Sequence, residues 1–210
     1  MLDTLCPSVA VTDRRCCLDC NQRGVVVKNL STSRAVDDAA AKYGCSVVAA
    51  AVGEINVANR MVELNAVIGG EGNGGVMLPE IHIGRDAIVA ATLVLQHFAW
   101  YRKGHAGSGS LSDLKRSLPQ WEIVKLKAPL GSLDPDTILA QMAKDWSGRE
   151  GARLNVEDGL RIDTDDWWVH MRKSNTEPIL RVIGEGTDVE AAKRICQQFL
   201  DEIVAFGPRS

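Results

Sequence analysis

The chain has 210 residues, of which 45% are hydrophobic and 24% are charged, and its formal net charge is −3 at pH 7. This composition is typical of a soluble protein with one or two domains. The slight acidity provides no general attraction for nucleic acid or for an anionic membrane, so any anion-binding site must be local.

No run of the sequence approaches the roughly 18 apolar residues that a membrane span requires. The first six residues contain no basic segment followed by an apolar one, as a secretion signal would. We therefore expect a cytoplasmic protein with neither a membrane nor a nucleic acid as partner.

The six cysteines fall into two groups. Four of them lie in the first twenty residues, namely Cys6, Cys16, Cys17 and Cys20. Cys17 and Cys20 have CxxC spacing, but neither a second CxxC nor a His pair at zinc spacing follows. Reduced thiols are the default for this group, and a zinc or redox role is the alternative. Cys45 and Cys196 stand in apolar surroundings and are expected in the core.

From Gly24 the sequence alternates between apolar runs and amphipathic segments. We expect strands over 25–27, 46–52 and 66–68, and helices over 34–43, 56–64 and 87–102. Asp86 is suited to cap the last of these helices. Strands and helices that alternate over short links predict an α/β layer domain with a mixed sheet. His82 pairs with no nucleophile and is expected to be structural.

The third strand runs into a glycine-rich segment, Gly69–Gly75, in which five of seven residues are Gly. Such a density indicates positive φ angles or a close approach of another group to the backbone. Glu71 opposes an anion at the centre of the segment. A carboxylate and a carboxamide suit neutral hydroxyls such as those of a sugar, since Glu71 accepts and Asn73 both donates and accepts. The alternative is a flexible tight turn.

Residues 103–110 are rich in Gly and Ser and predict a flexible segment, which a short helix over 111–118 follows. Beyond it we expect a smaller α+β domain, whose sheet is covered by helices on one face. The expected strands lie over 121–126, 153–156, 160–163, 167–171 and 179–183, and the helices over 135–147 and from Asp188 to about residue 207.

Between the last two predicted strands lies the polar run 172–178, which reads Arg-Lys-Ser-Asn-Thr-Glu-Pro. We predict that this run is a loop. It provides an Arg fork, two hydroxyls, a carboxamide and a Lys, and Arg181 follows on the next strand. This set of groups suits a phosphate, whose oxygens need several donors and a compensating charge. The alternative is a solvated hairpin tip held by local turn hydrogen bonds.

Arg-x-Ser-Asn-Thr-Glu-Pro, followed by an apolar strand that bears Arg and ends in Glu-Gly, resembles the C-terminal domain of the α-D-phosphohexomutases. These are the phosphoglucomutase, phosphomannomutase and phosphoglucosamine mutase enzymes. The segment Gly70–Gly75 resembles their sugar-contacting loop, with Asn73 where many members have Ser and Gly75 where some have His. This version is most similar to phosphoglucosamine mutase-like members.

The resemblance covers about residues 24–206, the third and fourth domains of a four-domain family, and residues 1–23 match poorly. It implies a third-domain-like unit over 1–105, a linker and short helix over 106–120, and the C-terminal domain over 121–210. It also implies that the sugar contacts Gly70, Glu71, Gly72 and Asn73, and that the phosphate contacts Arg172, Ser174, Asn175, Thr176 and Arg181. Glu54 is a further substrate-side candidate, with an exposed carboxylate at a helix start as the alternative.

The family's catalytic Ser-His-Asn-Pro loop and its Mg²⁺-binding Asp-x-Asp-x-Asp loop have no counterpart in the sequence. Thr164-Asp165-Asp166 and Ser132-Leu133-Asp134 lack the spacing. We therefore expect no catalytic residue and no metal ligand here, although the resemblance implies Mg²⁺ for the full enzyme.

Three hypotheses follow for the function. The first is that the chain is the half of a phosphohexose mutase that recognises the hexose phosphate, inactive alone, with the phosphoserine and metal domains on a separate chain or lost. The second is a non-catalytic sugar-phosphate-binding module, and the third is a truncated structural remnant. The sequence does not choose among glucose, mannose and glucosamine phosphates.

Overall fold

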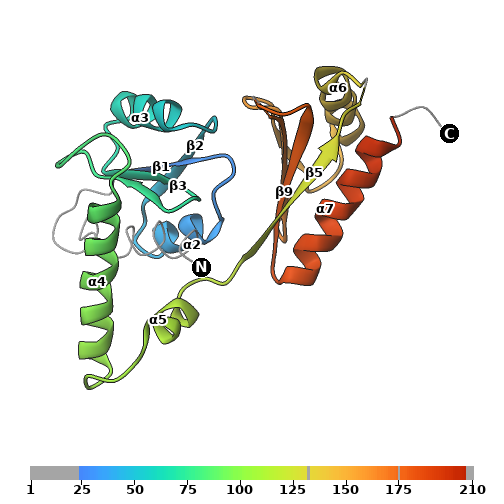
Figure 1. The fold of residues 1–210 in the computed structure, drawn as a ribbon. Coiled ribbons are helices and arrows are strands. Elements are labelled where there is room, and N and C mark those ends of the chain that lie inside the picture. The colour runs from blue at the N-terminus through green and yellow to red at the C-terminus, as the bar shows by residue number, and fades with distance from the viewer. Residues whose placement is uncertain (1–23, 132, 175, 207–210) are drawn as a thin grey trace. The chain divides into compact units, whose positions relative to one another are not determined.

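The computed structural model describes residues 24–131, 133–174 and 176–206 (Figure 1). The chain divides into two compact units, Met1–Gln120 and Trp121–Ser210. The four N-terminal cysteines, with the CxxC at Cys17 and Cys20, lie outside the described residues. That residues 106–120 act as a linker stays a prediction.

The first unit is built on a four-stranded sheet with the order β2-β1-β3-β4. Strands β1 (Val25–Asn29), β2 (Ser46–Ala50) and β3 (Ile68–Glu71) are parallel, and β4 (Gly75–Met77) is antiparallel to β3. Its helices are α2 (Ala35–Ala41), α3 (Glu54–Glu63), α4 (Ala87–Gly104) and α5 (Leu111–Ser117). The predicted α/β layer with a mixed sheet is confirmed.

Helices cover both faces of this sheet because neighbouring residues of β1 point to opposite sides. Val26 packs with apolar side chains of α2 and α4, whereas Val27 packs with those of α3. The chain leaves β1 toward β2 but leaves β3 toward β4, on the other side. In open α/β sheets ligands bind at the carboxyl ends of the strands where the connections diverge in this way.

The structure corrects several predicted boundaries in this unit. Strand β1 extends to Asn29 and β2 ends at Ala50. The prediction of one glycine loop over 69–75 is wrong, because β3 and β4 form a hairpin whose turn is residues 72–74. A Cβ atom on Gly70 would lie 2.5 Å from the carbonyl oxygen of Gly75, so Gly70 permits the two strands to pair this closely. The three-residue strand β4 was too short for its pattern to be recognised.

Side-chain caps mark the starts of helices α4 and α5. Asp86 accepts hydrogen bonds from the backbone N–H groups of Ile88 and Val89, as predicted. Helix α4 continues to Gly104, where the prediction had a flexible segment, and the Nε of Arg102 donates to the carbonyl oxygen of Gly107 at 2.9 Å. Ser110 and Asp113 form a reciprocal capping box at the start of α5.

The second unit is a five-stranded antiparallel sheet with the order β5-β9-β8-β7-β6. Its strands are β5 (Glu122–Pro129), β6 (Arg153–Asn155), β7 (Leu160–Asp163), β8 (Trp168–Lys173) and β9 (Ile179–Gly186). Helices α6 (Pro135–Trp146) and α7 (Val189–Val204) contribute to one apolar core with the same face of the sheet. The predicted α+β unit with helices on one face is confirmed.

The core of the second unit contains aromatic rings from both helices. The ring centroids of Trp146 and Phe199 are 5.1 Å apart, and Phe199 is fully buried. Cys196 lies in the same core, and its burial raises the pKa of the thiol to about 11. Cys45 is buried in the first unit, so both predicted core cysteines are confirmed.

None of the described helices is long and apolar enough to cross a membrane.

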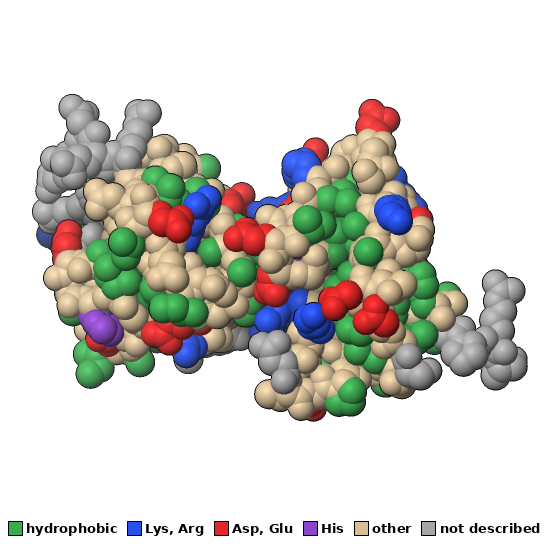
Figure 2. Space-filling view, turned by 90° about the horizontal axis from the view of Figure 1, so that it is seen from above, with side chains coloured by type: hydrophobic (Ala, Val, Ile, Leu, Met, Phe, Trp, Pro, Cys, Tyr) green, Lys and Arg blue, Asp and Glu red, His purple; other side chains and the backbone are tan. Residues whose placement is uncertain are grey.

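On the face drawn in Figure 2, acidic and basic side chains are interspersed, and no patch of a single sign dominates. On this face an anion site would depend on the local arrangement of side chains.

The buried ring of Phe199 gives a stability prediction for the second unit. Phe199→Ala is expected to lower the free energy of unfolding by about 3–5 kcal/mol, because burial is lost and a cavity is left. Urea titration followed by tryptophan fluorescence measures the change. Val204→Ala on the same helix is the control, because Val204 is 58% exposed and should shift stability by less than about 0.5 kcal/mol. Equal losses in the two variants would contradict the packing described here.

Candidate functional site

Glu71 lies at the carboxyl end of β3, where the topology favours a ligand site. The residue is only 4% exposed. Its Oε1 accepts hydrogen bonds from the Nδ2 of Asn29 at 2.8 Å and from the backbone N–H of Gly53 at 3.3 Å. The carboxylate therefore joins the ends of all three parallel strands, since Asn29 ends β1 and Gly53 follows β2.

Arg85 brings a positive charge to this carboxylate. Its Nη1 lies 3.4 Å from the Oε2 of Glu71. Its backbone N–H and its Nε each donate to the carboxylate of Glu54 at 2.9 Å. These hydrogen bonds, that of the backbone foremost, lower the pKa of Glu54. Glu54 thus starts α3, as the alternative interpretation had it, and also joins the site through Arg85.

The side chain of Arg85 occupies space above the glycine hairpin. A Cβ atom on Gly75 would lie 2.4 Å from the Cδ of Arg85, so a larger residue at this position would displace the arginine. The absence of a side chain at Gly75 therefore allows Arg85 to lie over the hairpin near both carboxylates.

The turn of the hairpin is held by local hydrogen bonds. The Oδ1 of the exposed Asn73 accepts from the backbone N–H of Gly75 at 3.1 Å. The backbone N–H of Gly72 donates to the Oγ1 of Thr32 at 2.8 Å, and this hydroxyl donates to the Oδ1 of Asn29 at 2.8 Å. The two side chains predicted to contact a sugar therefore differ in their surroundings. Glu71 is buried in the hydrogen-bond network, and Asn73 is exposed at the turn.

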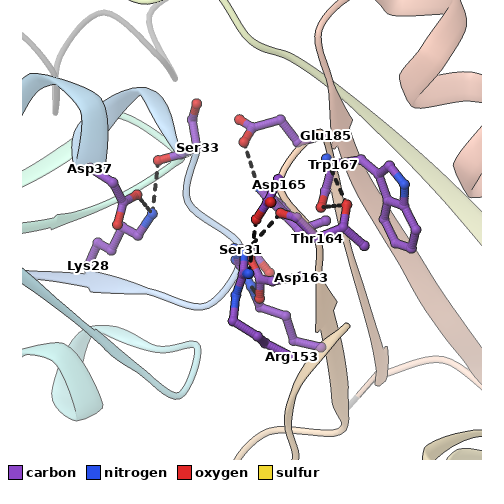
Figure 3. A network of polar contacts seen from close by, with 12 residues as sticks. Lys28, Ser31, Ser33, Asp37, Arg153, Asp163, Thr164, Asp165, Trp167 and Glu185 are labelled. Carbon is purple, nitrogen blue, oxygen red and sulfur yellow. Dashed lines mark hydrogen bonds and ion pairs between the residues drawn. The ribbon is translucent and has the colours of Figure 1, made fainter. Parts of the chain in front are cut away.

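The connection from β1 to α2 is fixed by the buried Lys28, shown in Figure 3. Its Nζ donates to the carbonyl oxygen of Ser33 at 3.1 Å and forms an ion pair with Asp37. This holds the segment that contains Thr32. Sequence reasoning missed Asn29, Thr32 and Arg85, although a polar residue directly after an apolar strand was a signal for Asn29.

In the second unit the structure corrects the predicted position of Arg172. It belongs to strand β8 and not to the loop, and it pairs directly with Arg181 on β9. Its side chain is 18% exposed, and its Nε lies 3.1 Å from the Oδ2 of Asp158. The loop begins only at Ser174, because the strand pairing continues through Lys173.

Strand register places a third cation beside these two arginines. Lys127 on β5 pairs with Arg181, so Lys127, Arg181 and Arg172 form a row across three neighbouring strands. Successive side chains of a strand point to opposite faces of the sheet. Because their neighbours Ala128, Leu180 and Met171 face the helices, these three cations lie on the face away from α6 and α7. Sequence reasoning missed Lys127, since only the register brings it to the site.

The loop after β8 is closed by backbone hydrogen bonds. The N–H of Ser174 donates to the carbonyl oxygen of Ile179 at 3.0 Å. The Oγ of Ser174 lies 3.4 Å from both the Oγ1 of Thr176 and the Nη2 of Arg181. Of the residues predicted to bind phosphate, Ser174, Thr176 and Arg181 are therefore brought together. Asn175 lies outside the described residues.

The buried His170 lies two residues before Arg172 on β8 and contacts Asp158, the partner of Arg172. The Nε2 of His170 donates to the carbonyl oxygen of Asp158 at 2.6 Å, which identifies the protonated nitrogen. Burial lowers the pKa of His170 to about 4, and the charges of Arg161 and Arg172 act in the same direction. His170 therefore stays neutral at pH 7 and holds Asp158, whose carboxylate faces Arg172.

Strands β7, β8 and β9 carry a second polar group on the same face. The guanidinium of Arg161 donates to both carboxylate oxygens of Asp163 at 2.7 Å and lies 4.1 Å from the ring centroid of Trp168. The Nε1 of Trp168 donates to Glu185 at 2.5 Å. These contacts fix the sheet that carries the cation row.

The residues that the structure describes do not fit a Mg²⁺ site. Among the described residues no three His, Cys, Asp or Glu side chains are grouped so that they could hold a metal ion. Asp165, in the segment that the sequence analysis considered, pairs instead with Arg153 at 3.0 Å, and Thr164 and Trp167 close the turn beside it (Figure 3).

Comparison with protein families decides where the chain belongs. Residues 10–120 match the phosphoglucomutase/phosphomannomutase alpha/beta/alpha domain III, and residues 126–202 match the C-terminal domain of the same family. The chain belongs to the phosphoglucomutase/phosphomannomutase family. The predicted resemblance is confirmed, and the match begins before residue 24, where the prediction had placed its start.

Individual relatives agree with this assignment. The chain is 34% identical over 173 residues to a phosphoglucomutase/phosphomannomutase of Thermococcus kodakarensis, covering 82% of this chain and 36% of that protein. It is 30% identical over 178 residues to a probable phosphoglucosamine mutase of Pyrococcus horikoshii, covering 84% and 38%. The chain therefore spans less than half the length of these relatives.

A solved structure supports the fold. A phosphoglucomutase/phosphomannomutase family protein from Burkholderia thailandensis matches with a TM-score of 0.74 and 19% sequence identity, covering 100% of this chain and 42% of that one. The fold of this chain is that of phosphohexomutase domains III and IV.

The pKa of His170 gives a pH prediction for the second unit. The unfolded chain binds the proton near pH 6.5 and the folded chain near 4, so the unfolded state binds more protons between these values. Stability should therefore fall as the pH falls from 6.5 to 4, with a contribution on the order of 3 kcal/mol from this residue.

Urea titration at several pH values, with tryptophan fluorescence as the signal, measures this contribution. His170→Gln keeps an N–H donor for Asp158 but does not titrate, so its stability should depend less on pH in this range. Carboxylates titrate in both proteins and are thereby controlled. The same pH slope in the variant and the unmodified chain would disprove the assignment of His170 as a buried neutral residue.

Proposed function

We propose that this chain is the part of a phosphohexose mutase that recognises the hexose phosphate. The observation that carries the proposal is the pairing of Arg172 with Arg181 beside the hydroxyls of Ser174 and Thr176. The names of the relatives, phosphoglucomutase/phosphomannomutase and phosphoglucosamine mutase, support a hexose phosphate as substrate. The reaction class is intramolecular phosphotransfer on such a sugar.

The phosphate is bound by the second unit. Two guanidinium groups on adjacent strands offer parallel N–H donors and positive charge, which fit phosphate oxygens better than a Lys point charge does. The hydroxyls of Ser174 and Thr176 add donors, and Asn175 adds its amide as the family resemblance implies. Asp158 orients Arg172 and offsets part of its charge while the site is empty of phosphate.

The sugar hydroxyls are bound by the glycine hairpin of the first unit. The Oε1 of Glu71 is engaged by Asn29 and Gly53, so its Oε2, which faces Arg85 at 3.4 Å, is the oxygen that accepts from a hydroxyl. Asn73 adds a carboxamide at the turn, and Gly70 and Gly72 allow the close approach. Glu54 reaches the same place through Arg85 and is the further substrate-side carboxylate.

These residues position the substrate and do not transfer the phosphoryl group. Mg²⁺, when bound in a phosphohexomutase, offsets the charge that builds on the transferring group. The residues described here do not fit it, so none of the steps above depends on the metal. On this proposal the chain by itself binds hexose phosphate without converting it, and the phosphoserine and metal domains belong to a separate chain or another part of the protein.

Arg172 provides the test. Arg172→Ala should weaken the binding of glucose 1-phosphate at least about tenfold, because charge-assisted hydrogen bonds are worth roughly 1.5–3 kcal/mol each. Arg172→Lys should recover only part of the loss, since it lacks the fork. Calorimetric or NMR titration at fixed ionic strength measures the dissociation constants.

Binding of glucose is the control for this test. The affinity for the phosphate-free sugar should hardly change in either variant, because its hydroxyls bind Glu71 and Asn73. Equal losses for glucose and for glucose 1-phosphate would mean that Arg172 supports the fold and does not bind phosphate. If the unmodified chain bound neither ligand, the chain would be a structural remnant.

A further inference from the structure

The cation row Lys127–Arg181–Arg172 is an unfavourable arrangement in the absence of an anion. Directly opposed like charges on neighbouring strands destabilise a sheet, because the Cβ atoms of such pairs lie only about 5 Å apart. Here the strand register creates two such pairs, Lys127 with Arg181 and Arg181 with Arg172.

Two carboxylates lie near these three cations. One of them has a single cation as partner, and the other has two. Asp158 lies beside Arg172 at 3.1 Å. Glu177 lies beside Lys127, with its two oxygens 3.3 Å and 3.2 Å from the Nζ, and its Oε2 is 3.8 Å from the Nη2 of Arg181. A single carboxylate from the loop thus partners two cations, of which Arg181 has the longer contact.

The carboxylate of Glu177 and the two cations beside it are accessible to a ligand. The side chains of Lys127, Glu177 and Arg181 are 61%, 44% and 42% exposed. The Nη2 of Arg181 contacts both the Oγ of Ser174 and the carboxylate of Glu177, so this carboxylate lies near the hydroxyls of the loop. The carboxylate therefore occupies the place where an anion would meet both Lys127 and Arg181.

We propose that Lys127 is a third phosphate-binding cation, and that Glu177 is an internal anion which the phosphate of the substrate displaces. This inference rests on the proposed function of the second unit and adds two residues to its phosphate site. A phosphate dianion carries more charge than one carboxylate and has more oxygens for the three cations. Its binding therefore relieves the repulsion within the row better than Glu177 does.

The test is titration of inorganic phosphate into the full chain at fixed ionic strength, followed by NMR or calorimetry. Lys127→Met should weaken phosphate binding about two- to fivefold, in the range expected for an exposed charge pair. Glu177→Gln keeps the shape of the side chain but removes its charge, and should strengthen binding by a similar factor. Lys144→Met, which removes an exposed Lys from helix α6, is the matched control for net charge and should leave the affinity unchanged.

A double variant separates displacement from a general change in charge. If Glu177 acts by holding Lys127, the gain from Glu177→Gln should shrink in the presence of Lys127→Met, whereas independent effects would add. Thermal unfolding of each variant shows that the fold is retained, and Lys127→Arg, which keeps the charge, should retain binding.

The results distinguish a failure of this inference from a failure of the proposed function. If Lys127→Met and Lys144→Met bind phosphate alike while Arg172→Ala and Arg181→Ala lose it, the inference is overturned and the proposed function stands. A Glu177→Gln variant that binds phosphate more weakly also overturns it. If the unmodified chain binds no phosphate, or if Arg172→Ala binds as well as the unmodified chain, the proposed function itself fails.

Discussion

The antiparallel register between β8 and β9 is the constraint on which the proposed phosphate site of the second unit depends. It sets Arg172 directly opposite Arg181, and the register between β5 and β9 adds Lys127 to the row. A shift of one residue would turn one of these side chains toward the apolar core. The helices fix the register by burying Met171, Val182 and Ala128 on the other face. The core of the second unit thereby determines where its cations stand.

In the first unit, the carboxylate of Glu71 is held at the junction of three parallel strands. A buried carboxylate is costly unless it is hydrogen-bonded and paired. Asn29, the backbone of Gly53 and the guanidinium of Arg85 meet this requirement for Glu71. The glycines of the hairpin permit the close approach, at Gly70 for the paired strands and at Gly75 for Arg85. The result is a carboxylate held in position by the protein itself, as the proposed recognition of sugar hydroxyls requires.

The family was predicted from the resemblance of the motif at residues 172–178. The two kinds of sheet and most elements were predicted because apolar periodicity and cap residues such as Asp86, Asp134 and Asp188 are local signals. It misplaced Arg172 in a loop, since a charged residue at the end of a strand resembles a turn residue in its chemistry. It missed Lys127 and Arg85, which reach their partners only through strand register and tertiary packing. Neither signal is present in a local pattern of residues.

The most direct test of the central claim is a pair of NMR titrations of the isotope-labelled chain. Inorganic phosphate should shift the resonances of Arg172, Ser174, Thr176 and Arg181, whereas glucose should shift those of Glu71 to Gly75. Two ligands that report on two separate sets of residues would support a chain that recognises a hexose phosphate at both ends. Shifts that ignore both sets, or the same residues responding to both ligands, would contradict the account.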